Sequence, residues 1–240
     1  MTKKETGTGN IVNIEFDMTK PMKMNSVVEF NKISLFVGPN GSGKTLILKM
    51  LWFANTVAMG AVKEKTLPLG MTIIDLAQFT LNHTFDNCDF EGSLKVNYER
   101  GSIKIAFVNG NVIGVEPDLQ DVTDMAVPIF MSKDARTFNQ IKMIMQLQAT
   151  VGQEKTLEMV KLYDLVYIEF LKKKLAKGLP ITKEFKQSLD DFGLKQYDMQ
   201  SFKIDNSSVY FTDSKGKDTE MTVLSAGEQS IVNMFIGSKA

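Results

Sequence analysis

The chain has 240 residues, with 28 Lys or Arg against 28 Asp or Glu, so its formal net charge of zero argues against a globally basic nucleic-acid-binding protein. Single copies of cysteine (Cys88) and histidine (His83) exclude an internal disulfide and a metal cluster built on these residue types, and fit a reducing cytosol. The polar start, residues 1–10, lacks the apolar core of a secretory signal, and we expect no apolar run that approaches the roughly 20 residues needed to cross a bilayer.

The first part of the chain predicts strands, then a loop and a helix. Ile11–Phe16 alternates apolar and polar residues, which predicts an edge strand. Val27–Phe30 and Ile33–Val37 are short apolar runs, and the second is nearly continuous, as in a strand buried on both faces. It leads into a glycine-rich segment, Gly38–Thr45, and then into an apolar segment to about Met59 that predicts a buried helix.

The next segment changes to an alternating pattern. From Thr80 to Glu116, apolar runs of period two are separated by Arg100-Gly101 and Asn109-Gly110, which predicts hairpin turns and an antiparallel β subdomain over residues 80–116. Val127–Met131 is a further buried run, and its proline predicts the start of a strand or an edge position.

Helical spacing dominates the following stretch. We expect helices over about Ala135–Ala149, Glu154–Ala176 and Lys183–Phe192, which together form a helical insert at residues 135–192. The apolar stripe of the second helix predicts packing on the protein body, with a coiled coil or partner helix as the alternative. Strands are predicted near Gln200–Ile204, Ser208–Thr212 and Glu220–Val223.

The glycine-rich segment has the form G-x-x-x-x-G-K-[ST] of a phosphate-binding P-loop, between a predicted strand and a predicted helix. Its candidate binding residues are Gly38, Pro39, Asn40, Gly41, Ser42, Gly43, Lys44 and Thr45. The glycines let successive backbone N–H groups face an anion, and the helix adds its positive N-terminal end. Lys44 is the candidate catalytic charge for the β- and γ-phosphates, and the Thr45 hydroxyl is the candidate Mg²⁺ ligand. We therefore expect ATP with Mg²⁺ as the ligand.

A second motif stands near the end of the sequence. It consists of Leu224, Ser225, Ala226, Gly227, Glu228 and Gln229. Ser225 followed three residues later by Glu228 predicts a capping box at the start of a helix. A hydroxyl and a small glycine at a helix N-terminus also suit an anion. Two such sites in one chain suggest that the second contacts a nucleotide held by another copy.

The two motifs together resemble those of the ABC-type ATPases. Gly38–Thr45 looks like their Walker A motif, and Leu224–Gln229 looks like their signature motif. The gap between the motifs, the β subdomain and the helical insert resemble the stand-alone ABC-type AAA-family ATPases, such as the ATPase parts of overcoming-lysogenization-defect (OLD) nucleases and of several phage-defence systems. The resemblance implies an α/β P-loop fold with a mixed sheet, in a single domain over residues 1–240. It also implies that residues 224–240 form the signature and its helix, with Ser225 and Gly227 at the γ-phosphate of a second copy.

The sequence departs from the family after the signature. A Walker B strand ending in Asp-Glu and a switch histidine do not follow Ser225. Val166–Glu169 and Ile73–Asp75 resemble a Walker B segment but stand before the signature. Gln78 is a candidate Q-loop glutamine or a surface residue, and Arg136 lies near the nucleotide or is a plain structural arginine. A truncated chain, a lobe supplied by a second polypeptide, and loss of hydrolysis each explain the departure.

Three functions remain as hypotheses. The leading one is an ATP-binding module that forms a homodimer or hetero-complex through its nucleotide interface, with hydrolysis only when the missing lobe is present. The second is a non-catalytic ATP-dependent clamp or sensor that partners a nuclease or other effector, and the third is an unrelated P-loop phosphotransferase. We expect a cytoplasmic protein with no membrane role. Lys172–Lys174 and Lys177 leave nucleic-acid binding open, although interaction with the helix dipole explains this cluster more simply.

Overall fold

The computed structural model describes residues 7–8, 10–30, 34, 36–37, 39, 42–62, 67, 70–85, 89–119, 122–124 and 137–238. The chain divides into two compact units, Met1–Pro128 and Ile129–Ala240. Helices and sheets occur in both units, so the coarse prediction of an α/β protein is confirmed. The predicted strand Ile33–Val37 lies partly outside the described residues, and Val127–Met131 and Arg136 lie wholly outside them.

The first unit is built on a five-stranded sheet in which every neighbouring pair is antiparallel. The strand order is β3-β2-β4-β5-β6. The strands are β2 (Ile11–Lys20), β3 (Met24–Glu29), β4 (Glu91–Tyr98), β5 (Gly101–Val108) and β6 (Asn111–Asp118). A separate short parallel pair joins β1 (Gly7–Thr8) to β7 (Val122–Asp124).

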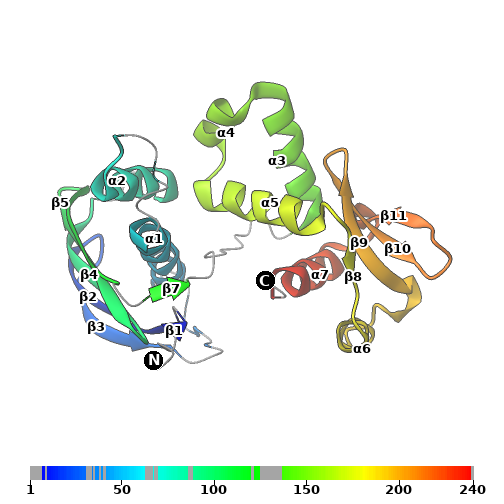
Figure 1. Cartoon of the computed structure of the whole chain (residues 1–240), viewed down its shortest axis with the longest axis horizontal. Helices are drawn as coiled ribbons and strands as arrows, with labels where there is room; N and C mark the ends of the chain where they lie inside the picture. Colours follow the sequence, from blue (N-terminus) through cyan, green and yellow to red (C-terminus); the bar gives the residue numbers. More distant parts are fainter. Residues whose placement is uncertain are drawn as a thin grey trace, which may run out of the picture. The chain divides into compact units, whose positions relative to one another are not determined.

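Two helices cover one face of this sheet, α1 (Lys44–Val62) and α2 (Ile73–Thr84) (Figure 1). The covered face follows from the alternating pattern of the strands, because every second side chain points toward the helices. In the register, Ile14 pairs with Val96, which pairs with Ile103, and all three are buried. Phe53 of α1 packs on Phe107 of β5 with ring centroids 6.0 Å apart. Burial of this apolar face is the main stabilising term of the unit.

The sequence prediction of an edge strand at Ile11–Phe16 is wrong, because β2 lies between β3 and β4. Its alternation reflects one buried and one solvent-facing side, and a central antiparallel strand shows the same pattern. The boundaries predicted for the β subdomain also differ: Thr80–Thr84 is the last part of α2, and the sheet includes β2 and β3. The hairpin turns at Arg100-Gly101 and Asn109-Gly110 are confirmed.

Helix α1 is long and apolar enough, by length and composition alone, to cross a membrane, which makes the earlier expectation about apolar runs wrong. Among the described residues it is the single helix that meets this test. Phe53, Ala54, Val57 and Ala58 of α1 are fully buried within the unit. A helix at the centre of a folded core passes the same test, and this burial favours that interpretation.

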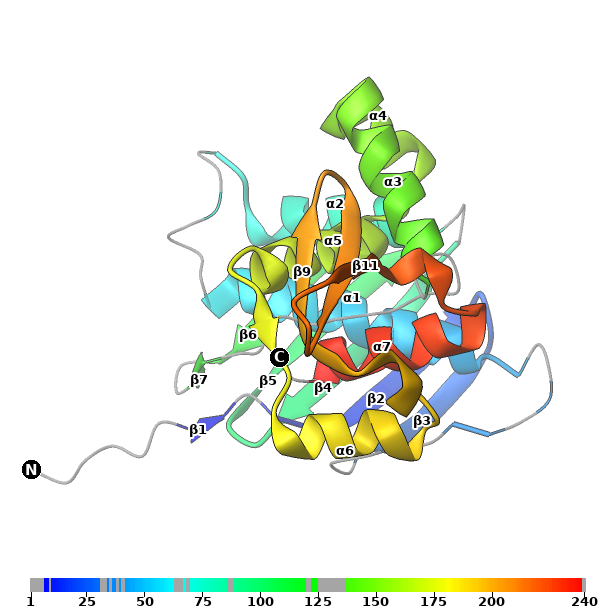
Figure 2. The ribbon, with the colours of Figure 1, turned by 90° about the vertical axis from the view of Figure 1, so that its right-hand side faces the viewer.

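The described residues of the second unit, 137–238, form five α-helices and a four-stranded antiparallel sheet of order β11-β10-β9-β8. The helices are α3 (Phe138–Val151), α4 (Gln153–Met159), α5 (Leu162–Leu175), α6 (Lys183–Asp191) and α7 (Ala226–Ser238). The strands and 3-10 turns are β8 (Leu179–Pro180), η2 (Lys195–Tyr197), β9 (Met199–Asp205), β10 (Ser208–Asp213), β11 (Asp218–Glu220) and η3 (Met221–Val223). Helices α6 and α7 lie side by side (Figure 2). Aromatic side chains join them, because the centroid of the Phe235 ring lies 5.4 Å from that of Phe185 and 5.6 Å from that of Phe192.

The core of this unit draws on helices and strands alike. Ile168, Leu171 and Leu175 of α5 are fully buried in it, so the apolar stripe packs on the body, as the sequence analysis expected. The helix predicted over Glu154–Ala176 is two helices, because Val160 and Lys161 are extended and end α4 before α5 begins. The strand predicted near Glu220–Val223 is wrong except for Glu220, since β11 ends at Glu220 and Met221–Val223 forms η3.

Candidate functional site

The described part of the P-loop ends in a tight turn that starts α1. The Ser42 N–H donates to the Pro39 carbonyl at 3.3 Å, and the Ile47 N–H donates to Gly43 at 3.0 Å. Gly43 has a φ of +82°, a left-handed conformation that favours glycine. Gly38, Asn40 and Gly41 lie outside the described residues.

Lys44 is the first residue of α1, and its side chain turns back over the loop. Its ammonium donates to the Pro39 carbonyl at 2.7 Å and to the Ser42 hydroxyl at 3.2 Å. Thr45, the candidate Mg²⁺ ligand, is exposed in the same first turn. No acidic side chain stands in that turn. The end of the loop thus combines a positive helix N-terminus with a lysine and a hydroxyl, which suits a phosphate-bearing anion.

The second motif divides into buried anchors and an exposed turn. Leu224 and Gln229 are buried, whereas Ser225, Ala226 and Gly227 are exposed. A β-carbon on Gly227 would meet no atom within 4 Å, so the space above it is open. The motif therefore presents a short stretch of small residues on the surface at the start of α7.

The predicted capping box of this helix is confirmed. The Ser225 N–H donates to Glu228 Oε2 at 2.8 Å, and the Glu228 N–H donates to Ser225 Oγ at 3.4 Å. The Tyr197 hydroxyl donates to Glu228 Oε1 at 3.1 Å. The backbone hydrogen bond from Ser225 is the main reason that the pKa of Glu228 lies below its usual value. The carboxylate is thus ionised at neutral pH and held over the helix start.

The P-loop belongs to the first unit and the signature-like motif to the second. Each site is therefore built by its own unit, on the first turn of a helix.

Two residues that the sequence analysis left out take part in the second site. The Asn139 N–H donates to Gln229 Oε1 at 3.2 Å, and Tyr197 contacts Glu228 as described above. A signal for Asn139 was present, because Thr137 and Gln140 form a capping box that starts the helix at Phe138 and so places Asn139 in its first turn. No local pattern marked Tyr197.

The Walker B look-alikes have structural partners. Val166–Glu169 lies inside α5, and Glu169 pairs with Lys172 at 2.7 Å. Asp75 caps α2 by accepting from the Thr72 N–H at 2.8 Å and the Thr72 hydroxyl at 2.7 Å. The hydrogen bond from the Thr72 side chain is the main cause of its lowered pKa. Val166–Glu169 and Ile73–Asp75 are thus helical, which agrees with the expectation that neither is a Walker B strand.

Gln78 and His83 also lie in α2. Gln78 accepts from the Val112 N–H at 2.7 Å and donates to Asn82 at 2.9 Å, which ties α2 to β6. His83 contacts the Phe79 carbonyl at 2.8 Å through Nδ1. Cys88 lies outside the described residues. Within the described part of the chain, no group of three or more His, Cys, Asp or Glu side chains could hold a metal ion.

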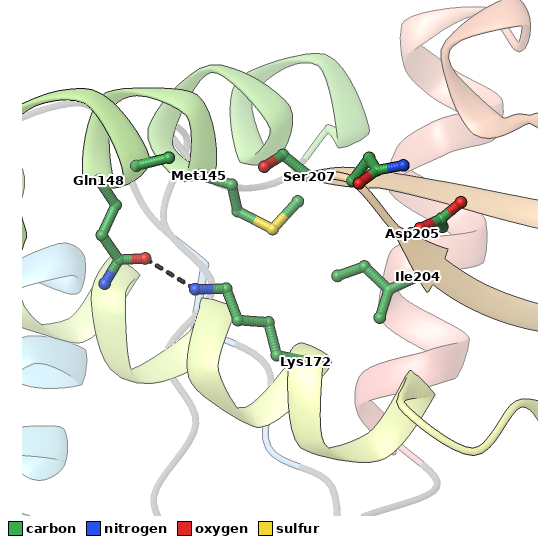
Figure 3. A pocket seen from close by; sticks show the side chains of 8 residues that line it. Met145, Gln148, Lys172, Ile204, Asp205 and Ser207 are labelled. Atoms are coloured by element: carbon green, nitrogen blue, oxygen red, sulfur yellow. Dashed lines mark hydrogen bonds between the residues drawn. The ribbon is translucent and has the colours of Figure 1, made fainter.

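Lys172, the first lysine of the cluster at the end of α5, lines a hollow of about 440 Å³ in the second unit (Figure 3). Helix α3, helix α5 and the β9–β10 turn line this hollow, which contains Met145, Gln148, Ala149, Lys172, Ile204, Asp205, Asn206 and Ser207. The Lys172 ammonium donates to Gln148 and to Glu169, each at 2.7 Å. Because Glu169 offsets its charge, Lys172 adds little positive potential that could attract nucleic acid. This favours interaction with the helix dipole as the explanation of the lysine cluster.

No family model matches this chain, and no curated protein matches it.

Proposed function

We propose that this chain is the ATP-binding module of an ABC-type ATPase. The observation that carries the proposal is Lys44 at the first position of α1, with its ammonium folded over the Pro39 carbonyl. Lys44 belongs to a segment with the form of an eight-residue phosphate-binding motif, and it stands at the positive end of α1, which supports the proposal. The β- and γ-phosphates would displace the ammonium from Pro39, and Mg²⁺ would be held by Thr45 and those phosphates.

The second part of the proposal is dimerisation driven by ATP. The exposed turn of Ser225, Ala226 and Gly227 leaves room for close approach by a nucleotide bound to another copy. Backbone N–H groups at the start of α7 would then face its γ-phosphate. The resulting complex is a homodimer, or a hetero-complex with a related head.

Hydrolysis needs a carboxylate that holds Mg²⁺ and another that orients the attacking water. The family places both after the signature, and residues 226–240 contain Glu228 as their sole acidic residue. Glu228 is committed to the Ser225 cap. We therefore propose turnover when a Walker B lobe is supplied.

The second candidate function is a non-catalytic clamp or sensor that acts with a nuclease or another effector. This function is favoured because two carboxylates that resemble Walker B residues have other partners. Glu169 pairs with Lys172, and Asp75 accepts from the Thr72 N–H. Nucleotide binding without turnover would then control assembly with the effector. Both candidate functions place the protein in the cytoplasm, where ATP is present.

The deciding experiment measures ATP binding, turnover and oligomeric state in one set of samples with Mg²⁺. We expect Lys44→Ala to abolish binding, because it removes the charge that faces the phosphates. Lys104→Ala is the matched control, since Lys104 is an exposed lysine on the sheet of the same unit. Unchanged ATP affinity in Lys44→Ala would overturn the proposal.

The dimer is tested with Ala226→Arg, which places a long charged side chain on the exposed turn and leaves the Ser225–Glu228 cap intact. Ser225→Arg tests the same surface with loss of the cap. We expect both variants to bind ATP and to remain monomeric. A monomer with rapid turnover that is indifferent to both substitutions would show that the ABC-type interpretation is wrong.

A further inference from the structure

One buried side-chain amide joins the starts of two helices in the second unit. Gln229 is 1% exposed. Its Oε1 accepts from the Asn139 N–H in the first turn of α3 at 3.2 Å, and its Nε2 donates to the Leu224 carbonyl at 2.7 Å. Residues 90 positions apart in the sequence are thus connected through a single planar group.

The chemistry of this bridge accounts for a glutamine at this position. The Asn139 N–H belongs to the first turn of a helix, where backbone donors lack a partner within the helix. The Leu224 carbonyl directly precedes the Ser225 cap. A side-chain amide offers a donor and an acceptor on two separate atoms of one neutral group, and leaving the buried Leu224 carbonyl without a partner would be costly.

A second buried polar contact fixes α7 one turn further along. Asn233 is fully buried and accepts from the Tyr167 hydroxyl of α5. Gln229 and Asn233 are four residues apart and therefore share one face of α7. Asn233 holds the body of the helix, whereas Gln229 holds its first turn and the residue before it. Loss of the Asn233 contact should therefore affect mainly the body of α7, whereas loss of the Gln229 contacts should affect mainly the exposed turn.

We propose that Gln229 is a positioning residue that couples the start of α3 to the Ser225–Gly227 turn. A partner or ligand that shifts α3 would move the turn through the Gln229 amide. Conversely, a nucleotide bound by the turn would stabilise the start of α3. The functional part of this inference rests on the proposed role of the turn in ATP-dependent dimerisation, and the structural part stands without it.

Amide hydrogen exchange on the intact chain tests the structural part without ATP. In Gln229→Met, which keeps the side-chain length and removes both hydrogen bonds, the Asn139 amide loses its acceptor directly. Coupling further predicts faster exchange, by roughly tenfold, at the amides of Ser225 and Glu228, whose own partners are untouched. Faster exchange at Asn139 alone would overturn the proposal.

Two variants make the comparison sharper. Gln229→Glu keeps an acceptor for Asn139 but turns a second oxygen toward the Leu224 carbonyl, so we expect protection at Asn139 to persist and protection at the turn to fall. Asn233→Leu removes a buried polar group one turn away and serves as the control for general loosening of α7. Equal effects of Asn233→Leu and Gln229→Met on the turn would show that Gln229 has no special role.

Binding measurements then separate this inference from the proposed function. At protein concentrations too low for dimerisation, we expect Gln229→Met to bind ATP like the wild type, because the P-loop belongs to the other unit. At higher concentrations we expect its ATP-dependent dimer to be roughly tenfold weaker. If the wild-type protein binds no ATP, the proposed function is wrong. The hydrogen-exchange data would still decide whether Gln229 couples the start of α3 to the turn. Wild-type dimerisation by Gln229→Met would overturn the functional part of the inference.

Discussion

A β-carbon added to Gly43 would lie 2.7 Å from the Cε atom of Met22, so the last glycine of the P-loop packs against the turn between β2 and β3. The methionine end is flexible and can move aside. The φ of +82° at Gly43 cannot be relieved in that way, because an L side chain is strained there.

Gly43→Ala is accordingly expected to lower the free energy of unfolding by about 1–2 kcal/mol and to weaken ATP binding by at least about tenfold. Gly114→Ala in the same unit is the control, since its added β-carbon meets nothing within 4 Å, and we expect a change below about 0.5 kcal/mol. Chemical denaturation and calorimetric ATP titration measure both effects. Equal behaviour of the two variants would show that the loop conformation at Gly43 is unimportant.

The Tyr167–Asn233 contact predicts energetic coupling between α5 and α7. Burial raises the pKa of the Tyr167 hydroxyl, so it remains a neutral donor throughout the physiological range. Tyr167→Phe should cost about 1–2 kcal/mol, because it removes a buried hydrogen bond. A double-mutant cycle with Asn233→Leu should show a coupling energy of at least about 0.5 kcal/mol. Tyr210→Phe on β10 is the control, and strictly additive effects in the cycle would contradict the contact.

The acid side of the stability profile depends partly on Asp198. The hydrogen bond from Lys186 is the main cause that lowers the pKa of Asp198 to about 2, with a further contribution from Ser214. Since the pKa is lower in the folded state than the usual value of about 3.9, the stabilisation is complete above pH 4 and is lost as the pH falls toward 2. In an NMR titration, Lys186→Met should raise this pKa toward 4, whereas Lys183→Met on the same helix should leave it unchanged.

The charge of Lys174 opposes folding, whereas the charge of Asp198 favours it. Its ammonium is buried without a hydrogen-bond partner among the described residues, lies 5.0 Å from the centre of the Phe170 ring, and has a pKa lowered by burial. A pKa that is lower in the folded state means that the charge opposes folding at neutral pH, and that stability rises as the pH passes this pKa on the way to about 10.4.

We therefore expect Lys174→Met to raise the free energy of unfolding at pH 7 by up to about 1 kcal/mol. The exposed neighbour gives the control Lys173→Met, which should have no effect. A less stable Lys174→Met protein would show that the attraction to the Phe170 ring exceeds the desolvation cost.

Local patterns predicted the helix after the P-loop, the hairpins of residues 91–118 and the cap at Ser225, because each depends on neighbours in sequence. The position of β2 in the middle of the sheet could not be predicted, since alternation reports which faces are buried and not which strands are adjacent. The break between α4 and α5 also escaped prediction. Neither Val160 nor Lys161 is a proline or a glycine, so the sequence carries no breaker signal at this point.

Helix α2 was missed although its start is marked in the sequence. Thr72 and Asp75 form a reciprocal cap that the spacing of a threonine and an acidic residue can indicate. Of the second site, the exposed turn followed from the motif, whereas the bridge from Gln229 to Asn139 spans distant segments and required the structure. The ligand, the dimer and the catalytic lobe stay predictions.

The path of the chain through the first sheet has a consequence for its synthesis. β2 pairs with β4 across a stretch that contains β3, the P-loop and both helices, so Ile14 meets Val96 only after that whole stretch has emerged. Closing so long a loop costs entropy before any contact offsets it, and such pairings form slowly. A nascent chain that stops short of β4 carries every residue of the P-loop, yet lacks the surface on which α1 rests.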